Sequence, residues 1–193
     1  SSRYESNGIY QYGGILRDIT NTGIINAGGS NTNGYGIYNQ REGTGDMQES
    51  IMGNITNTGI ITSYITPSQY NIGYGIANTG IMGNITNIGI ISGSSQHHGY
   101  GIYNVGTIRD ITNTGIISGT GTGVSSGSGY GIHNDSSGTM GAITNTGVIN
   151  GSVNAIKNNK DRNGNIGTIA TANNYGILAN SSNNEVVDGL DIV

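Results

Sequence analysis

The chain has 193 residues, 36 of them glycine, and it contains one proline but no cysteine, tryptophan or phenylalanine. Only 9% of the residues are charged, and the net charge is −4 at pH 7. The missing cysteines exclude a disulfide framework, and the few scattered Lys and Arg residues argue against a surface that follows nucleic-acid phosphates. No nucleic-acid partner is therefore expected.

A repeated motif, Tyr-Gly-Ile-x-Asn, organises the whole sequence. Copies start near residues 7, 35, 74, 100, 130, 154 and 175, and the copies at 7 and 154 are degenerate. A period of about 20–50 residues is typical of solenoids, in which stacked units bury their apolar faces against one another. Residues 1–193 are therefore expected to form one solenoid domain of about seven coils, with insertions at 40–50 and 63–73.

Within each unit, short runs of Ile and Thr are interrupted by Asn and Gly. Such runs predict short strands joined by tight corners, whereas a helix would lose about 0.5–1 kcal/mol at each glycine. Ile recurs in three columns, which are Ile37, Ile76, Ile102, Ile132 and Ile156; Ile19, Ile55, Ile85, Ile111 and Ile143; and Ile25, Ile61, Ile91, Ile117, Ile149 and Ile169. The expected fold is an all-β, three-sided parallel β-helix. Right-handed winding is the default, although the sequence leaves the handedness open.

Asn also recurs in columns, and Asn and Gly turn corners with positive φ at low steric cost. One column is Asn39, Asn78, Asn104, Asn134 and Asn158; the other is Asn21, Asn57, Asn87, Asn113 and Asn145, with Asn165 as a weaker copy. At a strand spacing of about 4.8 Å, identical amides hydrogen-bond into ladders that set the register. Gly36 is expected to have a positive φ at a corner, which a Gly36→Val change should disrupt.

Tyrosine occupies two positions of the motif. The first position holds Tyr35, Tyr74, Tyr100, Tyr130 and Tyr175, which we expect to stack on one another for stability. The fourth position holds Tyr10, Tyr38 and Tyr103, in a column shared with Ala77, His133, Lys157 and Leu178. This second column is a candidate aromatic strip for contact with a glycan or a protein.

The second coil carries both insertions. Residues 40–50 include Arg41, Glu42, Asp46 and Glu49, and residues 63–73 include Tyr64, Pro67 and Tyr70. Loops that leave a rigid solenoid often form binding surfaces. These residues are therefore candidate binding loops, and tolerated surface insertions are the alternative interpretation.

The sequence shows no catalytic or metal-binding pattern. Asp18 and Asp110 share a column but are three coils apart, about 14 Å by strand spacing, so they cannot act as a catalytic pair. His97 and His98 have no acidic residue in the same stretch to complete a metal site, and the calcium-binding Gly-Gly-x-Gly-x-Asp repeat does not occur. We expect a non-enzymatic protein that needs no metal or other cofactor.

The phrases Ile-Thr-Asn-Thr-Gly-Ile-Ile and Tyr-Gly-Ile-Tyr-Asn, repeated with Gly/Ser spacers over residues 7–180, resemble the passenger repeats of bacterial autotransporters. The resemblance is to large surface adhesins and vacuolating-cytotoxin-like proteins in particular. It implies a secreted β-helical stalk at the bacterial cell surface. The implied partner is a surface protein or glycan of the host or of a neighbouring cell.

Two alternative functions remain open. In one, the rod self-associates or continues its stack at both ends, which gives a head-to-tail extracellular filament. In the other, a Thr-x-Thr array binds ice; its members are Thr20/Thr22, Thr56/Thr58, Thr112/Thr114 and Thr144/Thr146, and Thr86/Ile88 interrupts it. The ice-binding alternative requires a straight strand, whereas Thr-Asn-Thr-Gly is typical of a corner.

Overall fold

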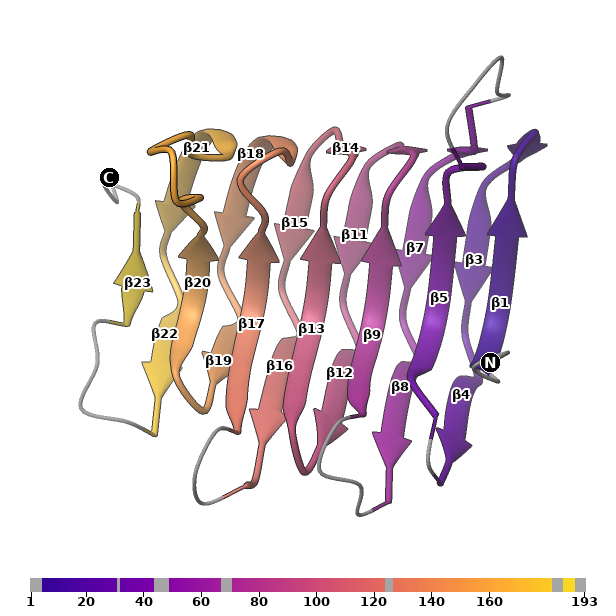
Figure 1. Cartoon of the computed structure of the whole chain (residues 1–193), viewed down its shortest axis with the longest axis horizontal. Helices are drawn as coiled ribbons and strands as arrows, with labels where there is room; N and C mark the ends of the chain where they lie inside the picture. The colour runs from indigo at the N-terminus through magenta and orange to yellow at the C-terminus, as the bar shows by residue number, and fades with distance from the viewer. Residues whose placement is uncertain are drawn as a thin grey trace.

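The computed structural model describes residues 5–30, 32–43, 49–66, 71–123, 127–181 and 186–189, which form a parallel β-solenoid of about six turns (Figure 1). The fold class predicted from the sequence is confirmed. The short Ile- and Thr-rich runs form strands because β-branched side chains pack well on a pleated, half-buried surface. No helix occurs in these ranges, and hence none that is long and apolar enough to cross a membrane.

Three parallel sheets form the sides of the solenoid. Sheet A contains β1 (Ser6–Tyr12), β5 (Gly34–Gln40), β9 (Ile72–Asn78), β13 (His98–Asn104), β17 (Ser128–Asn134), β20 (Asn154–Asn158) and β23 (Val187–Asp188). Sheet B contains β2 (Ile15–Leu16), β3 (Ile19–Asn21), β6 (Ile51–Met52), β7 (Ile55–Asn57), β10 (Ile81–Met82), β11 (Ile85–Asn87), β14 (Thr107–Ile108), β15 (Ile111–Asn113), β18 (Thr139–Asn145) and β21 (Thr168–Asn174). Sheet C contains β4 (Ile24–Gly29), β8 (Ile60–Ile65), β12 (Ile90–Ser95), β16 (Ile116–Gly121), β19 (Val148–Gly151) and β22 (Ile177–Asn180).

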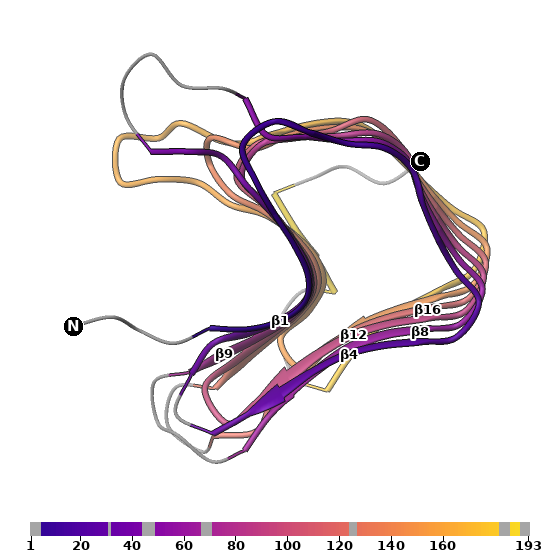
Figure 2. The ribbon, with the colours of Figure 1, turned by 90° about the vertical axis from the view of Figure 1, so that its right-hand side faces the viewer.

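The winding is right-handed. Each turn passes from sheet A through sheet B to sheet C. Seen from the N-terminal end, this path runs clockwise as the chain recedes from the viewer (Figure 2). A clockwise path that recedes is a right-handed screw, which agrees with the default for parallel crossovers.

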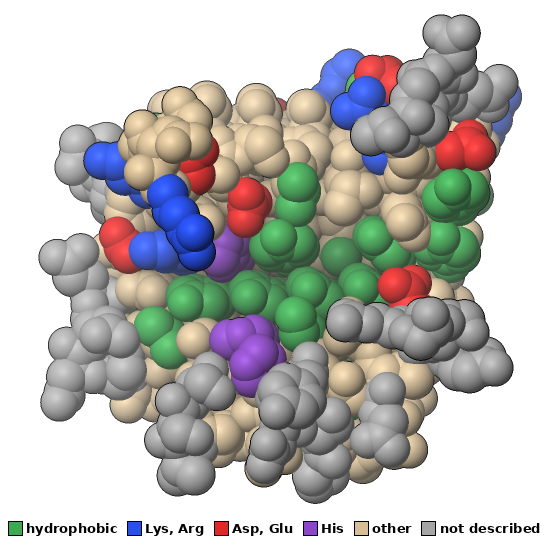
Figure 3. Space-filling model, viewed as in Figure 1, with side chains coloured by type: hydrophobic (Ala, Val, Ile, Leu, Met, Phe, Trp, Pro, Cys, Tyr) green, Lys and Arg blue, Asp and Glu red, His purple; other side chains and the backbone are tan. Residues whose placement is uncertain are grey.

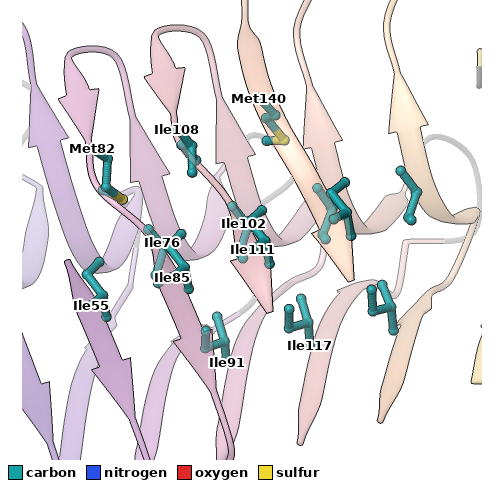
Figure 4. Packing of buried hydrophobic residues seen from close by; sticks show 14 of the residues in the cluster. Ile55, Ile76, Met82, Ile85, Ile91, Ile102, Ile108, Ile111, Ile117 and Met140 are labelled. Carbon is teal, nitrogen blue, oxygen red and sulfur yellow. The ribbon is translucent and has the colours of Figure 1, made fainter. Parts of the chain in front are cut away.

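The predicted isoleucine columns fill the interior of the solenoid (Figure 4). Strand pairing places Ile on Ile in successive coils, and Ile76, Ile85 and Ile91 are fully buried. Burying one such side chain contributes roughly 1.5–3 kcal/mol. The core therefore runs the length of the rod as continuous columns.

A fourth interior column was not anticipated, because its residue types vary. Its members are Leu16, Met52, Met82, Ile108, Met140 and Ile169. The prediction that Ile169 continues the column of Ile149 is wrong, because Ile169 pairs with Met140 and Leu178 follows Ile149 instead. The methionines are suited to this position because their flexible side chains fill irregular gaps.

The two asparagine ladders are confirmed. In each ladder the side-chain amide N–H of one Asn donates to the side-chain oxygen of the Asn in the next coil, over 2.7–3.0 Å. Asn165 is not part of the second ladder, since it bonds Asp161 in the loop after β20. Asn174 takes that place and accepts from Asn145.

The glycine of the Tyr-Gly-Ile motif is required by close packing. The prediction of a positive φ at Gly36 is wrong; within the described ranges, glycines with positive φ are Gly13, Gly14, Gly164 and Gly189. A Cβ on Gly101 would lie 2.5 Å from the carbonyl oxygen of Gly131 in the next coil and 2.7 Å from Cγ2 of Ile117. No room is left for a methyl group where sheet C approaches sheet A.

Two predicted boundaries are also wrong. Residue 175 does not start a coil, because Ile177 lies in β22 and pairs with Val148 in sheet C, whereas Val187 of β23 is the residue that continues sheet A. The second insertion is shorter than residues 63–73, since Ser63–Ile65 belong to β8 and β9 already begins at Ile72.

The close approach at Gly101 predicts that Gly101→Ala lowers the free energy of unfolding by about 1–3 kcal/mol, because the added methyl overpacks the interior. Gly23→Ala is the matched control, because no atom lies within 4 Å of a Cβ at that position. Urea unfolding followed by circular dichroism measures both variants. Equal stability of the two variants would contradict the assignment.

The ladder predicts that Asn104→Asp costs about 3–5 kcal/mol at pH 7, because it buries an unpaired carboxylate. Asn104 is fully buried and donates to Asn134 and to the carbonyls of Gly106 and Thr139. Burial raises the pKa of the new carboxyl. The loss of unfolding free energy in the variant, relative to the native chain, should therefore shrink as the pH falls toward about 4 and the carboxyl is protonated.

The matched control is Asn84→Asp, in an exposed column where Asp18 and Asp110 already stand. Unfolding titrations at pH 7 and at pH 4 test both variants. The control should change stability by less than about 0.5 kcal/mol. If the loss of unfolding free energy in Asn104→Asp does not depend on pH, this would argue against a buried carboxylate.

Candidate functional site

The outer face of sheet A is concave, because its strands bend at the Tyr-Gly-Ile motif (Figure 2). In a regular strand alternate residues face opposite sides, so Tyr35 and Ile37 would share a side. Instead Gly36 and Ile37 both face the interior, since a Cβ on Gly36 would meet Ile61 and Ile37 is fully buried in the core. Tyr35 and Tyr38 therefore both face outward, with stacked rings whose centroids are 4.3 Å apart.

Four tyrosines form a continuous stack along this face. The ring centroids of Tyr35, Tyr74, Tyr100 and Tyr130 follow one another at 4.7, 5.1 and 5.6 Å, with planes within 18° of parallel. The predicted fifth member, Tyr175, does not belong to the stack; its backbone N–H donates to the carbonyl of Asn145 at the corner after β21, and its side chain is 76% exposed.

A second column lies beside the stack on the same face. Strand pairing orders it as Tyr10, Tyr38, Ala77, Tyr103, His133, Lys157 and Asp188. The prediction that Leu178 belongs here is wrong, because that residue lies in sheet C. The ring of Tyr103 packs against Tyr74 and Tyr100, at centroid distances of 5.4 and 5.1 Å.

The two columns together form a hydrophobic band across the face (Figure 3), which we call the aromatic face. It comprises Tyr35, Tyr38, Tyr74, Ala77, Tyr100, Tyr103, Tyr130 and His133. Because the stacked rings cover one another's faces, Tyr35, Tyr74 and Tyr100 are only 7–9% exposed. Burial raises the pKa of Tyr35 and of Tyr103 to about 12, and it raises the pKa of Tyr74 further. The phenols are therefore uncharged donors and acceptors at neutral pH.

His133 is a buried titratable group within the aromatic face. Its side chain packs edge-on against Tyr100 and Tyr130, and neither ring nitrogen has a hydrogen-bond partner. Burial lowers the pKa of His133 to about 4, although Asp135, 4.0 Å from Nε2, opposes the shift. Lys157 and His98 also contribute to this lowered pKa. His133 is therefore neutral at physiological pH.

Acidic and amide groups border the aromatic face. The hydroxyl of Tyr103 donates to Asp135 over 3.5 Å, and that of Tyr10 donates to the side chain of Gln40 over 2.6 Å. Lys157 forms an ion pair with Asp188 at the C-terminal end of the second column. The face therefore combines apolar ring surface with a polar margin, a composition that is typical of ligand-binding sites.

The insertion after β5 forms a cleft next to the aromatic face. The cleft has a volume of about 750 Å³ and is lined by Arg41, Glu42, Gly43, Thr79, Val105, Gly106, Thr107 and Ser137. The backbone N–H of Arg41 donates to Oγ1 of Thr79 over 2.8 Å, and Glu49 lines a smaller adjoining recess. Asp46 lies outside the described residues. The cleft brings two of the four predicted residues of this loop, Arg41 and Glu42, together with hydroxyl groups of later coils, and Glu49 lies in the adjoining recess.

The second predicted loop is elsewhere. Tyr64 lies in β8 on the outer side of sheet C and is 59% exposed, while Pro67 and Tyr70 lie outside the described residues. One insertion follows sheet A and the other follows sheet C. The structure therefore does not bring Tyr64 and Arg41 into one site.

Asp18 and Asp110 have a structural role that the sequence analysis missed. The carboxylate of Asp18 accepts the backbone N–H of Asn54, and that of Asp110 accepts the N–H of Ala142, each over 2.7 Å. Asn54 and Asn84 make the equivalent bonds in the coils between them. The column is thus a third ladder, from side chain to backbone. Among the residues that the structure describes, no group of three or more His, Cys, Asp or Glu could hold a metal ion.

The sequence did contain a signal for part of this site. His133 fills the fourth motif position, which Tyr38 and Tyr103 occupy in other coils, and this shared position predicts a common column. The bend that turns both tyrosine columns to one side has no such signal. Comparison with protein-family models, with curated proteins and with solved structures found no match for this chain.

The lowered pKa of His133 predicts a loss of stability on acidification. The neutral side chain supports folding fully above its unfolded pKa of about 6.5, and this contribution is lost as the pH falls toward 4. That loss should disappear in His133→Tyr, because tyrosine does not titrate in this pH range. Tyrosine already stands in this column at Tyr10, Tyr38 and Tyr103. Thermal unfolding between pH 7 and pH 4 measures this loss of stability in the native chain and in the variant. As the control, the two proteins should have similar stability at pH 7. An identical acid response of both proteins would refute the assignment.

Proposed function

We propose that this chain is a non-enzymatic β-solenoid segment, exported to the bacterial cell surface, that acts as a stiff adhesive stalk. Its aromatic face would contact a protein or glycan on the surface of a host or neighbouring cell. The aromatic face is the observation that carries the proposal, since it extends along the rod over successive coils and is uncharged over most of its length. Such a surface suits an extended polymer better than a small molecule.

The side chains of the aromatic face favour recognition of polar, uncharged chains. Phenol hydroxyls donate and accept hydrogen bonds, and successive coils repeat them at about 4.8 Å along the axis. A ligand with regularly spaced hydroxyl or amide groups can therefore bond several coils at once. The cleft beside Arg41 and Glu42 adds charged groups at one margin of the face.

The stiffness of the rod supports a display role. Fully buried amide ladders connect successive coils, and each ladder resists slippage because a shift would leave buried polar groups unpaired. A stalk built in this way holds its binding surface at a constant geometry. Location at the bacterial surface rests on the resemblance of the repeats to autotransporter passengers.

The filament alternative remains a second proposal, and the ice-binding alternative has less support. The second Thr of each pair lies at the corner between sheets B and C, and its hydroxyl donates to a backbone carbonyl of the preceding coil at Thr58, Thr114 and Thr146. The two Thr columns therefore flank a corner and do not share one flat lattice.

The adhesive role predicts that the purified chain binds cells or immobilised surface glycans, and that Tyr38→Ala with Tyr103→Ala weakens binding by more than about tenfold, since aromatic anchors dominate interface energies. Alanine is tolerated in this column, where it occurs at Ala77. Tyr175→Ala, which removes an exposed tyrosine outside the aromatic face, is the matched control. Biolayer interferometry and a cell-binding assay measure the effect.

Two outcomes would count against this proposal. Unchanged binding by a folded double variant would remove the aromatic face from the site. If the native chain binds none of the cells or glycans tested, the adhesive role itself is contradicted.

A further inference from the structure

The outer side of sheet C carries an aliphatic column in every coil, exposed in four coils and half-buried at Ile60 and Val148. Its members are Ile24, Ile60, Ile90, Ile116, Val148 and Ile177, in continuous parallel register. Even at the centre of the sheet, Ile90 and Ile116 remain 36% and 39% exposed. Exposed apolar residues scattered singly need no explanation, but a contiguous apolar row marks an interaction surface.

The residues beside this column are small and uncharged. The next outward column is Asn26, Thr62, Ser92, Ser118, Asn150 and Ala179. The six strands of sheet C, all within the described ranges, contain no Asp, Glu, Lys or Arg. The face is therefore an aliphatic ridge beside a shallow row of small side chains, and the exposed Tyr64 stands next to that row in β8.

We propose that this face of sheet C binds the same face of a second copy of the chain, so that two rods lie side by side. A two-fold axis parallel to the solenoid axis places the ridge of one copy over the small-residue column of the other. Both surfaces repeat at the same strand spacing, so the contact made in one coil is made in all of them. This inference rests on sheet C alone and does not depend on the aromatic face.

Charge and area both favour a second copy as the occupant. The chain has a net charge of −4, so association through a charged face would bring like charges together, and sheet C avoids this cost. Sheet C has four strands of six residues and two of four. At about 4.8 Å between strands and about 3.3 Å per residue, the face measures about 500 Å², so a pair covers about 1,000 Å² in total. That area is at the threshold of about 1,000 Å² for a biological interface, as expected for a weak dimer.

Other exposed apolar residues do not form such a surface. On sheet B the outward column begins with Ile15, Ile51 and Ile81 but continues as Thr107, Thr139 and Thr168. On sheet A the apolar side chains pack on one another in the aromatic face. Sheet C keeps its aliphatic row through all six of its strands.

Sedimentation velocity on the full chain tests the proposal, at concentrations from about 1 μM to about 1 mM. The native chain should dimerise, and Ile116→Lys should raise the dissociation constant more than about tenfold, because it buries a charge without a partner. Thr112→Lys is the matched control, since it adds the same charge in the same coil on the exposed outer side of sheet B. Circular dichroism confirms that each variant is folded.

A cross-linking experiment locates the interface. The chain has no cysteine, so Ser118→Cys and Thr112→Cys each introduce a single thiol. A short bismaleimide should link copies through residue 118 and not through residue 112. A native chain that stays monomeric over the whole range overturns the proposal. A dimer that Ile116→Lys does not weaken, or that cross-links through residue 112 instead, also overturns it.

Discussion

The amide ladder of buried asparagines is the interaction on which the rest of this structure depends. In the middle coils each amide N–H₂ group donates to the Asn side chain of the next coil and to two backbone carbonyls, as Asn78 does to Asn104, Gly80 and Thr107. Because these groups are fully buried, an unmatched partner would cost about 1–3 kcal/mol. One coil must therefore stack on the next with corresponding residues in register.

That register turns repetition in sequence into columns in space. Isoleucine falls on isoleucine in the core, tyrosine falls on tyrosine outside it, and Asp18, Asn54, Asn84 and Asp110 form a third ladder at a corner. Close stacking also sets the steric rules. Gly36 and its equivalents are glycines because the column of sheet C isoleucines comes within contact distance of their strand. The bend that follows from this contact makes the outer face of sheet A concave.

The three sides of the rod consequently differ in chemistry, although one repeat builds them all. Sheet A presents the tyrosine rings and their partly charged margin. In sheet B, Asp18 and Asp110 lie at the corner between the two short strands of a coil. Sheet C is uncharged and aliphatic. A rod with distinct sides can bind different partners at once. The proposed contact with a surface ligand and the proposed contact with a second copy therefore use separate faces and do not compete.

The sequence by itself determined the fold class, the asparagine ladders, the three isoleucine columns and the tyrosine column of Tyr35, Tyr74, Tyr100 and Tyr130, because an exact repeat stacked in parallel can bring only like residues together. It failed at Tyr175, Ile169 and Leu178, which resemble motif positions. Backbone pairing places Ile169 and Leu178 in other columns, and Tyr175 lies at the corner after β21. Only the tertiary structure decided the bend at Gly36, the neutral state of buried His133 and the exposed ridge of sheet C. These features depend on how closely one sheet approaches another, and that distance is set by packing across the core between residues far apart in the chain.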